Sequence, residues 1–142
     1  MTVVVGYRAG KVGLSGLHLG VRIARTRATS LTVATIVPKP WLTPSRARID
    51  AEYELWADTM AAESAKEAAR FLDTVADGIE VSYLHRAHGS VSGGLLEIIH
   101  EVDADVLVLG SLPSGGRGQV LIGSTADWLL HASPVPVAIS PR

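Results

Sequence analysis

Apolar residues along the chain fall into short runs that alternate with longer amphipathic stretches. The short runs are rich in valine, isoleucine and leucine, as expected for strands that helices cover on both faces. The longer stretches place apolar side chains along one side of a helix. The predicted strands cover residues 3–5, 30–37, 79–85, 106–109 and 135–140, and the predicted helices cover residues 11–27, 47–76, 91–102 and 125–131. The predicted order is βαβαβαβαβ.

This order predicts an α/β fold. Strands that alternate with helices form a parallel sheet with right-handed crossovers and helices on both faces. We therefore expect residues 1–142 to form one domain with a five-stranded, doubly wound, Rossmann-like sheet. Such sheets bind ligands at the carboxyl ends of the strands where the winding direction reverses. The loops after the first, second and fourth strands are the expected site.

Composition excludes several classes of partner. The 142 residues are 47% hydrophobic and 19% charged, which suits one compact core. The chain has 13 Lys and Arg and 14 Asp and Glu, so its net charge is close to zero. No overall electrostatic field therefore attracts nucleic acid or anionic lipid. The absence of cysteine excludes disulfides and thiolate metal sites. With no signal-like start and no apolar run of about 18 residues, we expect a soluble, cytoplasmic protein without a membrane partner.

The glycine-rich segment 110–124 carries the clearest candidate chemistry. It follows a predicted buried strand and leads into a helix. Glycines let the backbone approach a phosphate closely, and the free amides at a helix start donate hydrogen bonds to anions. A purely structural loop before a capped helix would use the same residue types. The segment therefore indicates an anion site or a structural connection.

Residues in and around this segment resemble the universal stress protein family. Its signature is a glycine, two residues, a glycine, nine residues, then glycine and serine or threonine, and Gly110, Gly123 and Ser124 fit that spacing. The match extends over residues 104–111, 115–116 and 130–137, and the element order agrees over the whole chain. The chain is identified as a member of this family, which implies the adenine nucleotide alpha hydrolase-like fold.

The resemblance implies an ATP site. In ATP-binding members, the ends of the glycine-rich loop hold the phosphates and ribose, and adenine lies against the ends of the first two strands. A magnesium ion would accompany the nucleotide. The matching positions here are Gly6, Tyr7, Arg8, Ile36, Leu109, Gly110, Pro113, Gly123, Ser124 and Thr125, and the loop also offers Gly115, Gly116 and Arg117.

Two positions depart from the family pattern. Pro113 replaces the second signature glycine and lacks an amide hydrogen, and Arg8 replaces the aspartate usual after the first strand. One hydrogen bond lost to a charged group costs about 1.5–3 kcal/mol, or about 10- to 150-fold in affinity. Arg8 and Arg117 could instead contact a phosphate directly. Two alternatives therefore remain: a nucleotide site with altered phosphate contacts, or a nucleotide site that has been lost.

Other candidates have simpler interpretations. Ser124, with Asp127 three residues later, is typical of a helix N-cap, and a hydroxyl contact with phosphate is compatible with that role. The 114–116 segment resembles the phosphate loop of ATP pyrophosphatases, but it follows the wrong strand and lacks the completing aspartate and serine. His85 and His88 flank the end of the predicted third strand, where a loop is expected to follow, and they are expected to be solvated or hydrogen-bonded, since no acid or cysteine accompanies them.

Two further features concern catalysis and contacts. Nothing resembles a G-x-S-x-G elbow, so covalent catalysis has no candidate. Trp41 follows the second strand and is the best placed of the three tryptophans to contact adenine. The last strand, Val135 to Ser140, would form an exposed edge, and the resemblance implies a homodimer that pairs through it. Pro136 limits which side of this strand can donate.

The sequence leaves three hypotheses. The first is a stress-response regulator that binds ATP or a related adenine nucleotide without catalysis and changes its contacts with an unknown regulatory protein. The second keeps the fold and the dimer but loses the nucleotide through Pro113 and Arg8. The third is a hydrolase, which would need a water-positioning base and a magnesium ligand that the sequence does not show near the loop.

Overall fold

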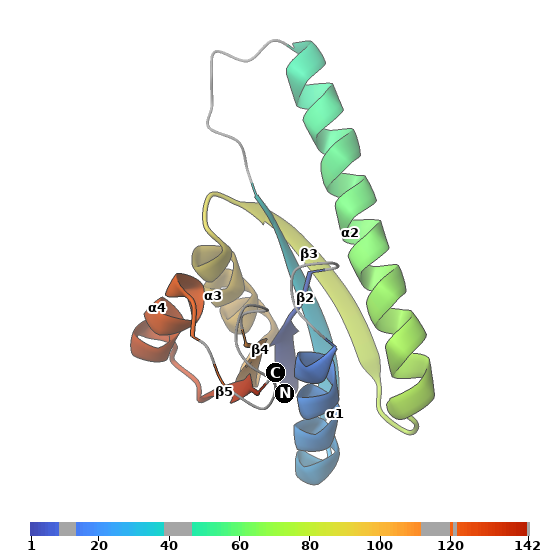
Figure 1. Cartoon of the computed structure of the whole chain (residues 1–142), viewed down its shortest axis with the longest axis vertical. Helices are drawn as coiled ribbons and strands as arrows, with labels where there is room; N and C mark the ends of the chain where they lie inside the picture. The colour runs from blue at the N-terminus through green and yellow to red at the C-terminus, as the bar shows by residue number, and fades with distance from the viewer. Residues whose placement is uncertain (9–13, 39–46, 112–119, 121, 142) are drawn as a thin grey trace.

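The computed structural model of the chain describes residues 1–8, 14–38, 47–111, 120 and 122–141, with the backbone alone for 47–51. The predicted order of strands and helices is confirmed (Figure 1). The elements are β1 (Thr2–Gly6), α1 (Ser15–Arg27), β2 (Ser30–Pro38), α2 (Ala47–Val75), β3 (Val81–His88), α3 (Val91–Val102), β4 (Ala104–Gly110), α4 (Ser124–Ala132) and β5 (Val137–Ser140).

The five strands form one parallel sheet in the order β3-β2-β1-β4-β5. From β1 the chain winds outward through β2 to β3, and then returns to the opposite side of β1 for β4 and β5. Val4 of β1 pairs with Thr32 of β2 on one side and with Leu107 of β4 on the other. The winding direction therefore reverses between β1 and β4, as the doubly wound prediction required.

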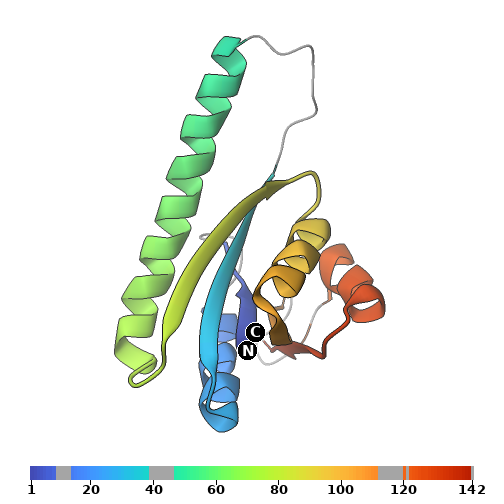
Figure 2. The same ribbon diagram turned by 180° about the vertical axis from the view of Figure 1, so that it is seen from behind.

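Alternation along β1 divides the core into two layers. Val3, Val4 and Val5 are fully buried. Val3 and Val5 pack with residues of α1 and α2, whereas Val4 packs with residues of α3 and α4, because successive side chains of a strand point to opposite faces. Figure 2 shows the two pairs of helices on opposite faces of the sheet. A strand with two buried faces explains the uninterrupted valine run.

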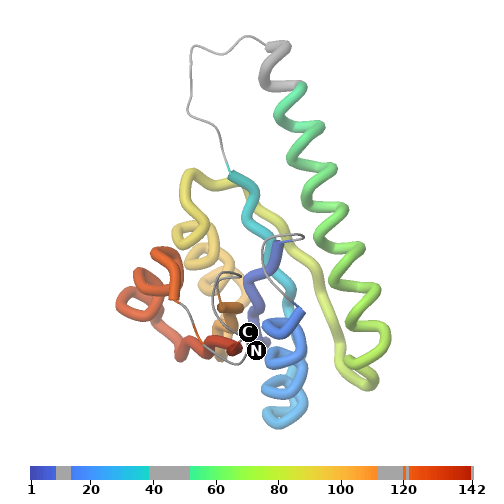
Figure 3. The backbone as a smooth tube through the Cα atoms, in the orientation of Figure 1, coloured from blue at the N-terminus to red at the C-terminus, as the bar shows by residue number. Residues whose placement is uncertain are grey.

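Helix α2 is held to the sheet mainly by its C-terminal half. Ala68, Leu72 and Ala76, the residue after the helix ends, are buried in the layer that includes α1. The N-terminal part of the 29-residue helix extends beyond the strand ends, which is clearest in the tube view (Figure 3). The buried contacts of α2 in this layer are thus concentrated toward its C-terminal end.

Several predicted boundaries shift. Strand β3 covers Val81–His88 rather than 79–85, because β2 continues to Pro38 and pairs with β3 as far as His88. Strand β5 begins at Val137 rather than 135. Before it, Val135 donates its N–H to the Ser133 hydroxyl oxygen, and that hydroxyl donates to the Val135 carbonyl. This local turn uses the backbone groups that a sheet ladder would need.

Candidate functional site

A cavity of about 420 Å³ opens where the winding direction reverses. Its walls come from the carboxyl ends of β1, β2 and β4 and from the first turns of α3 and α4. The predicted site residues that line it are Gly6, Tyr7, Arg8, Ile36, Leu109, Gly110, Gly123, Ser124 and Thr125. Pro113, Gly115, Gly116 and Arg117 lie outside the described residues, as does Trp41.

One wall of the cavity is apolar. Ile36, Leu95, Leu109 and Ala126 line it, and all four belong to the core layer beneath α3 and α4. Gly6 lets these side chains close in, since a β-carbon there would lie 3.0 Å from Leu109 Cδ2. A flat aromatic ring fits a surface of this kind.

The other wall is the start of α4. The N-cap is Gly123, with extended backbone, and its carbonyl accepts the N–H of Asp127 at 2.9 Å. The expectation that Ser124 caps the helix is therefore wrong, because Ser124 is the first helical residue and Gly123 precedes it as the N-cap. First-turn amides of a helix have no partner within it, so those near Ser124 and Thr125 are suited to an anion.

Arg8 gives the cavity its charge. It follows β1, is half-buried, and is the sole charged side chain among the described lining residues. The guanidinium and the helix N-terminus both favour negative charge, and no carboxylate in the described lining opposes them. An apolar wall that faces two sources of positive potential suits a ligand with a ring at one end and an anion at the other.

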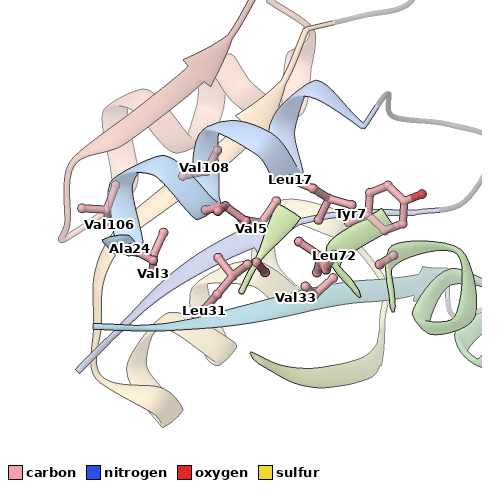
Figure 4. Packing of buried hydrophobic residues seen from close by; sticks show 13 residues of the cluster. Val3, Val5, Tyr7, Leu17, Ala24, Leu31, Val33, Leu72, Val106 and Val108 are labelled. Atoms are coloured by element: carbon pink, nitrogen blue, oxygen red, sulfur yellow. The ribbon is translucent and has the colours of Figure 1, made fainter. Parts of the chain in front are cut away.

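Tyr7 lines the cavity but sends its side chain to the opposite face of the sheet. The residue is 3% exposed and packs with Leu17 and Leu72 of the α1 and α2 layer (Figure 4). Its phenol donates a hydrogen bond to Glu67 of α2. Burial, and then the hydrogen bond and charge of Glu67, raise the pKa of the Tyr7 phenol well above its usual range. The phenol therefore stays neutral and acts as a donor.

The start of α3 adds lining residues that sequence analysis missed. Val91 and Leu95 line the cavity, together with Ala34 and Ala126. The N-cap Ser90 accepts the N–H of Gly93 at 3.0 Å, which fixes the first turn that carries Val91. Val91 and Leu95, four residues apart on the predicted helix, were the available signal, but the sequence did not show which strand ends that helix approaches.

His85 lies in β3 as the predicted strand implied, but β3 continues through His88, so the prediction of a loop after His85 is wrong. His88 accepts the Ser90 N–H through Nδ1 at 2.9 Å and lies 3.1 Å from Glu97 through Nε2. It thus supports the start of α3. His85 is exposed on the other face of β3. Within the described part of the chain, no three His, Asp or Glu side chains gather as metal ligands.

Comparison with known proteins decides the family. The sequence profile described as the universal stress protein family matches residues 1–141. The chain belongs to the universal stress protein family. It is 70% identical over 142 residues to a universal stress protein of Mycobacterium tuberculosis strain H37Rv. The aligned region covers 100% of this chain and 49% of that relative. The chain thus spans about half the length of this relative and of the two other curated relatives that are 70% identical to it.

Solved universal stress proteins share the fold. The structure of the Archaeoglobus fulgidus protein in complex with dAMP has a TM-score of 0.70 at 20% identity, covering 99% of this chain and 97% of that one. A universal stress protein in complex with cAMP has a TM-score of 0.67 at 23% identity, covering 98% and 95%. At these identities the likeness shows the adenine nucleotide alpha hydrolase-like fold, as the sequence predicted.

Among the described helices, none combines the length and the apolar character that a transmembrane span requires. Helix α2, the longest, carries charged residues along its length.

Proposed function

We propose that this universal stress protein chain binds ATP or a related adenine nucleotide in the 420 Å³ cavity, without catalysis, as a cytoplasmic stress-response regulator. The observation that carries the proposal is the composition of the described lining. An apolar wall faces a guanidinium and a helix N-terminus at the point where the sheet reverses. The dAMP and cAMP complexes of two structural neighbours support it.

Each wall has a proposed role. Adenine packs against Ile36, Leu95 and Leu109, and the phosphates accept hydrogen bonds from the first-turn amides of α4 and from Arg8. Pro113, Gly115, Gly116 and Arg117 belong to the proposed phosphate loop. Since no carboxylate is present in the described lining, magnesium would arrive bound to the nucleotide.

The absence of catalysis is part of the proposal. Phosphoryl transfer to water needs a group that orients or deprotonates the water. Neither an imidazole nor a carboxylate is found among the described residues of the lining. We therefore expect occupancy, rather than turnover, to change contacts with a regulatory protein partner.

Two further parts of the proposal concern assembly. We expect residues 1–142 to act as one nucleotide-binding unit, and two such units to form a homodimer through the β5 edge. Val137, Ala138 and Ile139 are apolar and half-buried, and β4 is the one described strand that pairs with them. The exposed side chains of Val120 and Ile122 add apolar surface outside this strand.

The alternative function is a universal stress protein dimer that acts through protein contacts alone. Arg8 is the observation that favours it, because the family pattern has a carboxylate there. Pro113 would remove a second nucleotide contact.

Calorimetric titration with ATP separates these functions when phosphate release is followed in the same samples. We expect the wild-type protein to bind ATP without releasing phosphate, and Pro113→Gly to bind about 10-fold more tightly because an amide donor returns. Binding by Pro113→Gly but not by the wild type would establish the alternative function. Steady phosphate release by the wild type would show an enzyme instead.

A further inference from the structure

One contact joins the cavity to the opposite layer of the molecule. The phenol of Tyr7, which follows β1, donates to the half-buried carboxylate of Glu67 on α2, 60 residues away. The aliphatic side chains that line the cavity belong instead to the layer of α3 and α4. Tyr7 therefore lines the cavity and reaches α2 with its side chain.

The backbone of Tyr7 is fixed on both sides. Its N–H donates to the Ala34 carbonyl at 2.9 Å, and its carbonyl accepts the Thr35 hydroxyl at 2.8 Å. Both partners lie in β2, and Ala34 itself lines the cavity. A shift of the strand ends on ligand binding would move the Tyr7 backbone and its phenol together, because these bonds leave little room for independent movement.

Helix α2 packs on the sheet less completely toward its N-terminus. On the N-terminal side of Glu67, a cavity of about 370 Å³ is lined by Asp58, Ala61 and Ala65 of α2 and by residues of β2 and β3. Tyr83 of β3, which lines this second cavity, is 37% exposed. Ala61 and Ser64 are nevertheless buried, so the looser packing of α2 begins on the N-terminal side of Ala61, where Leu55 and Trp56 are exposed.

Two hydrogen bonds join α2 to strand ends at the same edge of the sheet. Glu67 accepts from Tyr7 at the end of β1, and the Tyr53 hydroxyl donates to the Pro38 carbonyl at the end of β2 at 2.6 Å. Both strand ends lie at the carboxyl edge of the sheet, where the cavity opens. Helix α2 is therefore attached to the same strand ends that would contact a nucleotide.

We propose that the Tyr7–Glu67 contact couples occupancy of the nucleotide cavity to the position of α2, with Glu67 as a positioning residue that acts through Tyr7. This inference depends on the proposed function, since it needs a nucleotide in the cavity. It identifies α2, which exposes Leu55 and Trp56, as the element whose surface changes with occupancy. Linkage requires the effect to be reciprocal, so weakening the contact must also weaken nucleotide binding.

A double-mutant cycle tests the coupling. ATP affinity is measured by calorimetry for the wild type, Tyr7→Phe, Glu67→Ala and the double variant. Each single variant should bind about 5- to 10-fold more weakly, and the double variant no more weakly than either, because both remove one contact. Glu67→Gln keeps an acceptor for the phenol and should recover most of the affinity. Glu63→Ala, an exposed glutamate one turn away, should match the wild type.

Hydrogen exchange separates coupling from a merely structural role. ATP should slow amide exchange in residues 60–72 of the wild-type protein and leave it unchanged in Tyr7→Phe at saturating ATP. Unchanged affinity in the single variants, additive losses in the double variant, or ATP binding without any change in α2 would each overturn the coupling alone. A wild-type protein that binds no ATP would overturn the proposed function and the coupling with it.

Discussion

Arg8 and Tyr7 are neighbours in sequence but act on opposite faces of the sheet. Arg8 brings the charge of the described cavity lining, whereas the Tyr7 side chain is buried in the layer of α1 and α2. Sequence analysis placed both at the site because both follow β1, and the structure brings both to the cavity. The Tyr7 side chain continues the alternation of Val3 and Val5 past the strand end, so its direction follows from the sequence pattern, whereas its partner Glu67, 60 residues away, does not.

The raised pKa of Tyr7 leads to a prediction at alkaline pH. In the unfolded chain the phenol loses its proton near pH 10, whereas the folded protein holds it, so stability is fully present below about pH 10 and falls as pH rises above it. The slope approaches about 1.4 kcal/mol per pH unit for one proton. Urea unfolding between pH 8 and 11 should show this decline in the wild type and a shallower one in Tyr7→Phe.

The comparison isolates Tyr7 because the other perturbed tyrosines remain in both proteins. Burial also raises the pKa of Tyr53 and Tyr83, so their contributions cancel in the difference between the two pH profiles. Profiles that stay parallel up to pH 11 would mean that Tyr7 ionises in the folded protein as readily as in the unfolded chain.

Helix α3 approaches β2 closely enough to control the apolar wall of the cavity. A β-carbon on Gly94 would lie 2.8 Å from Cδ1 and 2.9 Å from Cγ2 of Ile36, which lines that wall. Any larger residue at 94 must displace Ile36, which borders the space proposed for adenine. Glycine at this position therefore has a packing reason, although it lowers the helix propensity of α3.

Gly94→Ala should weaken both folding and nucleotide binding. Overpacking costs about 1–3 kcal/mol, partly offset by about 1 kcal/mol of helix propensity, so we expect a net loss of about 1 kcal/mol in urea unfolding. ATP affinity by calorimetry should fall as Ile36 moves. Gly89→Ala is the matched control, because a β-carbon there meets no atom within 4 Å. Equal behaviour of the two variants would show that Ile36 has room to move elsewhere.

Elements were more predictable than their contacts. The valine run of β1 and the four amphipathic stretches predicted the order of all nine elements and hence the site between β1 and β4. Strand β3 extends to His88 because its partner β2 continues to Pro38, and pairing length is a property of two strands rather than one. Val91 and Leu95 were missed as lining residues for the same reason, since their role depends on where α3 lies on the sheet.

The two edges of the sheet differ in how readily they could pair with another chain. Edge strand β3 presents His85 and Arg86, the latter paired with Glu101 of α3, and charged edges discourage pairing. Edge strand β5 presents three consecutive apolar residues. A second copy of the chain is therefore better accommodated at β5, which is where the homodimer is proposed.

Backbone direction in β5 sharpens this expectation. The Pro136 and Ser140 carbonyls accept the N–H groups of Leu107 and Ser111, so these even-numbered positions face β4. Backbone groups of alternate residues point to opposite edges of a strand, so Val137 and Ile139 turn theirs to the open side. The amide that Pro136 lacks belongs to the β4 side, and the outward edge loses no donor.

Val137→Pro should separate the dimer without unfolding the chain. Proline removes the first outward N–H, yet it is tolerated at the first residue of an edge strand. We expect sedimentation equilibrium to find dimers of the wild type and folded monomers of Val137→Pro. Ala138→Pro removes an N–H on the β4 side and should instead lower the free energy of unfolding. Dimers that persist in Val137→Pro would place the interface on another surface, because an isologous β5 pair cannot form its full ladder without that donor.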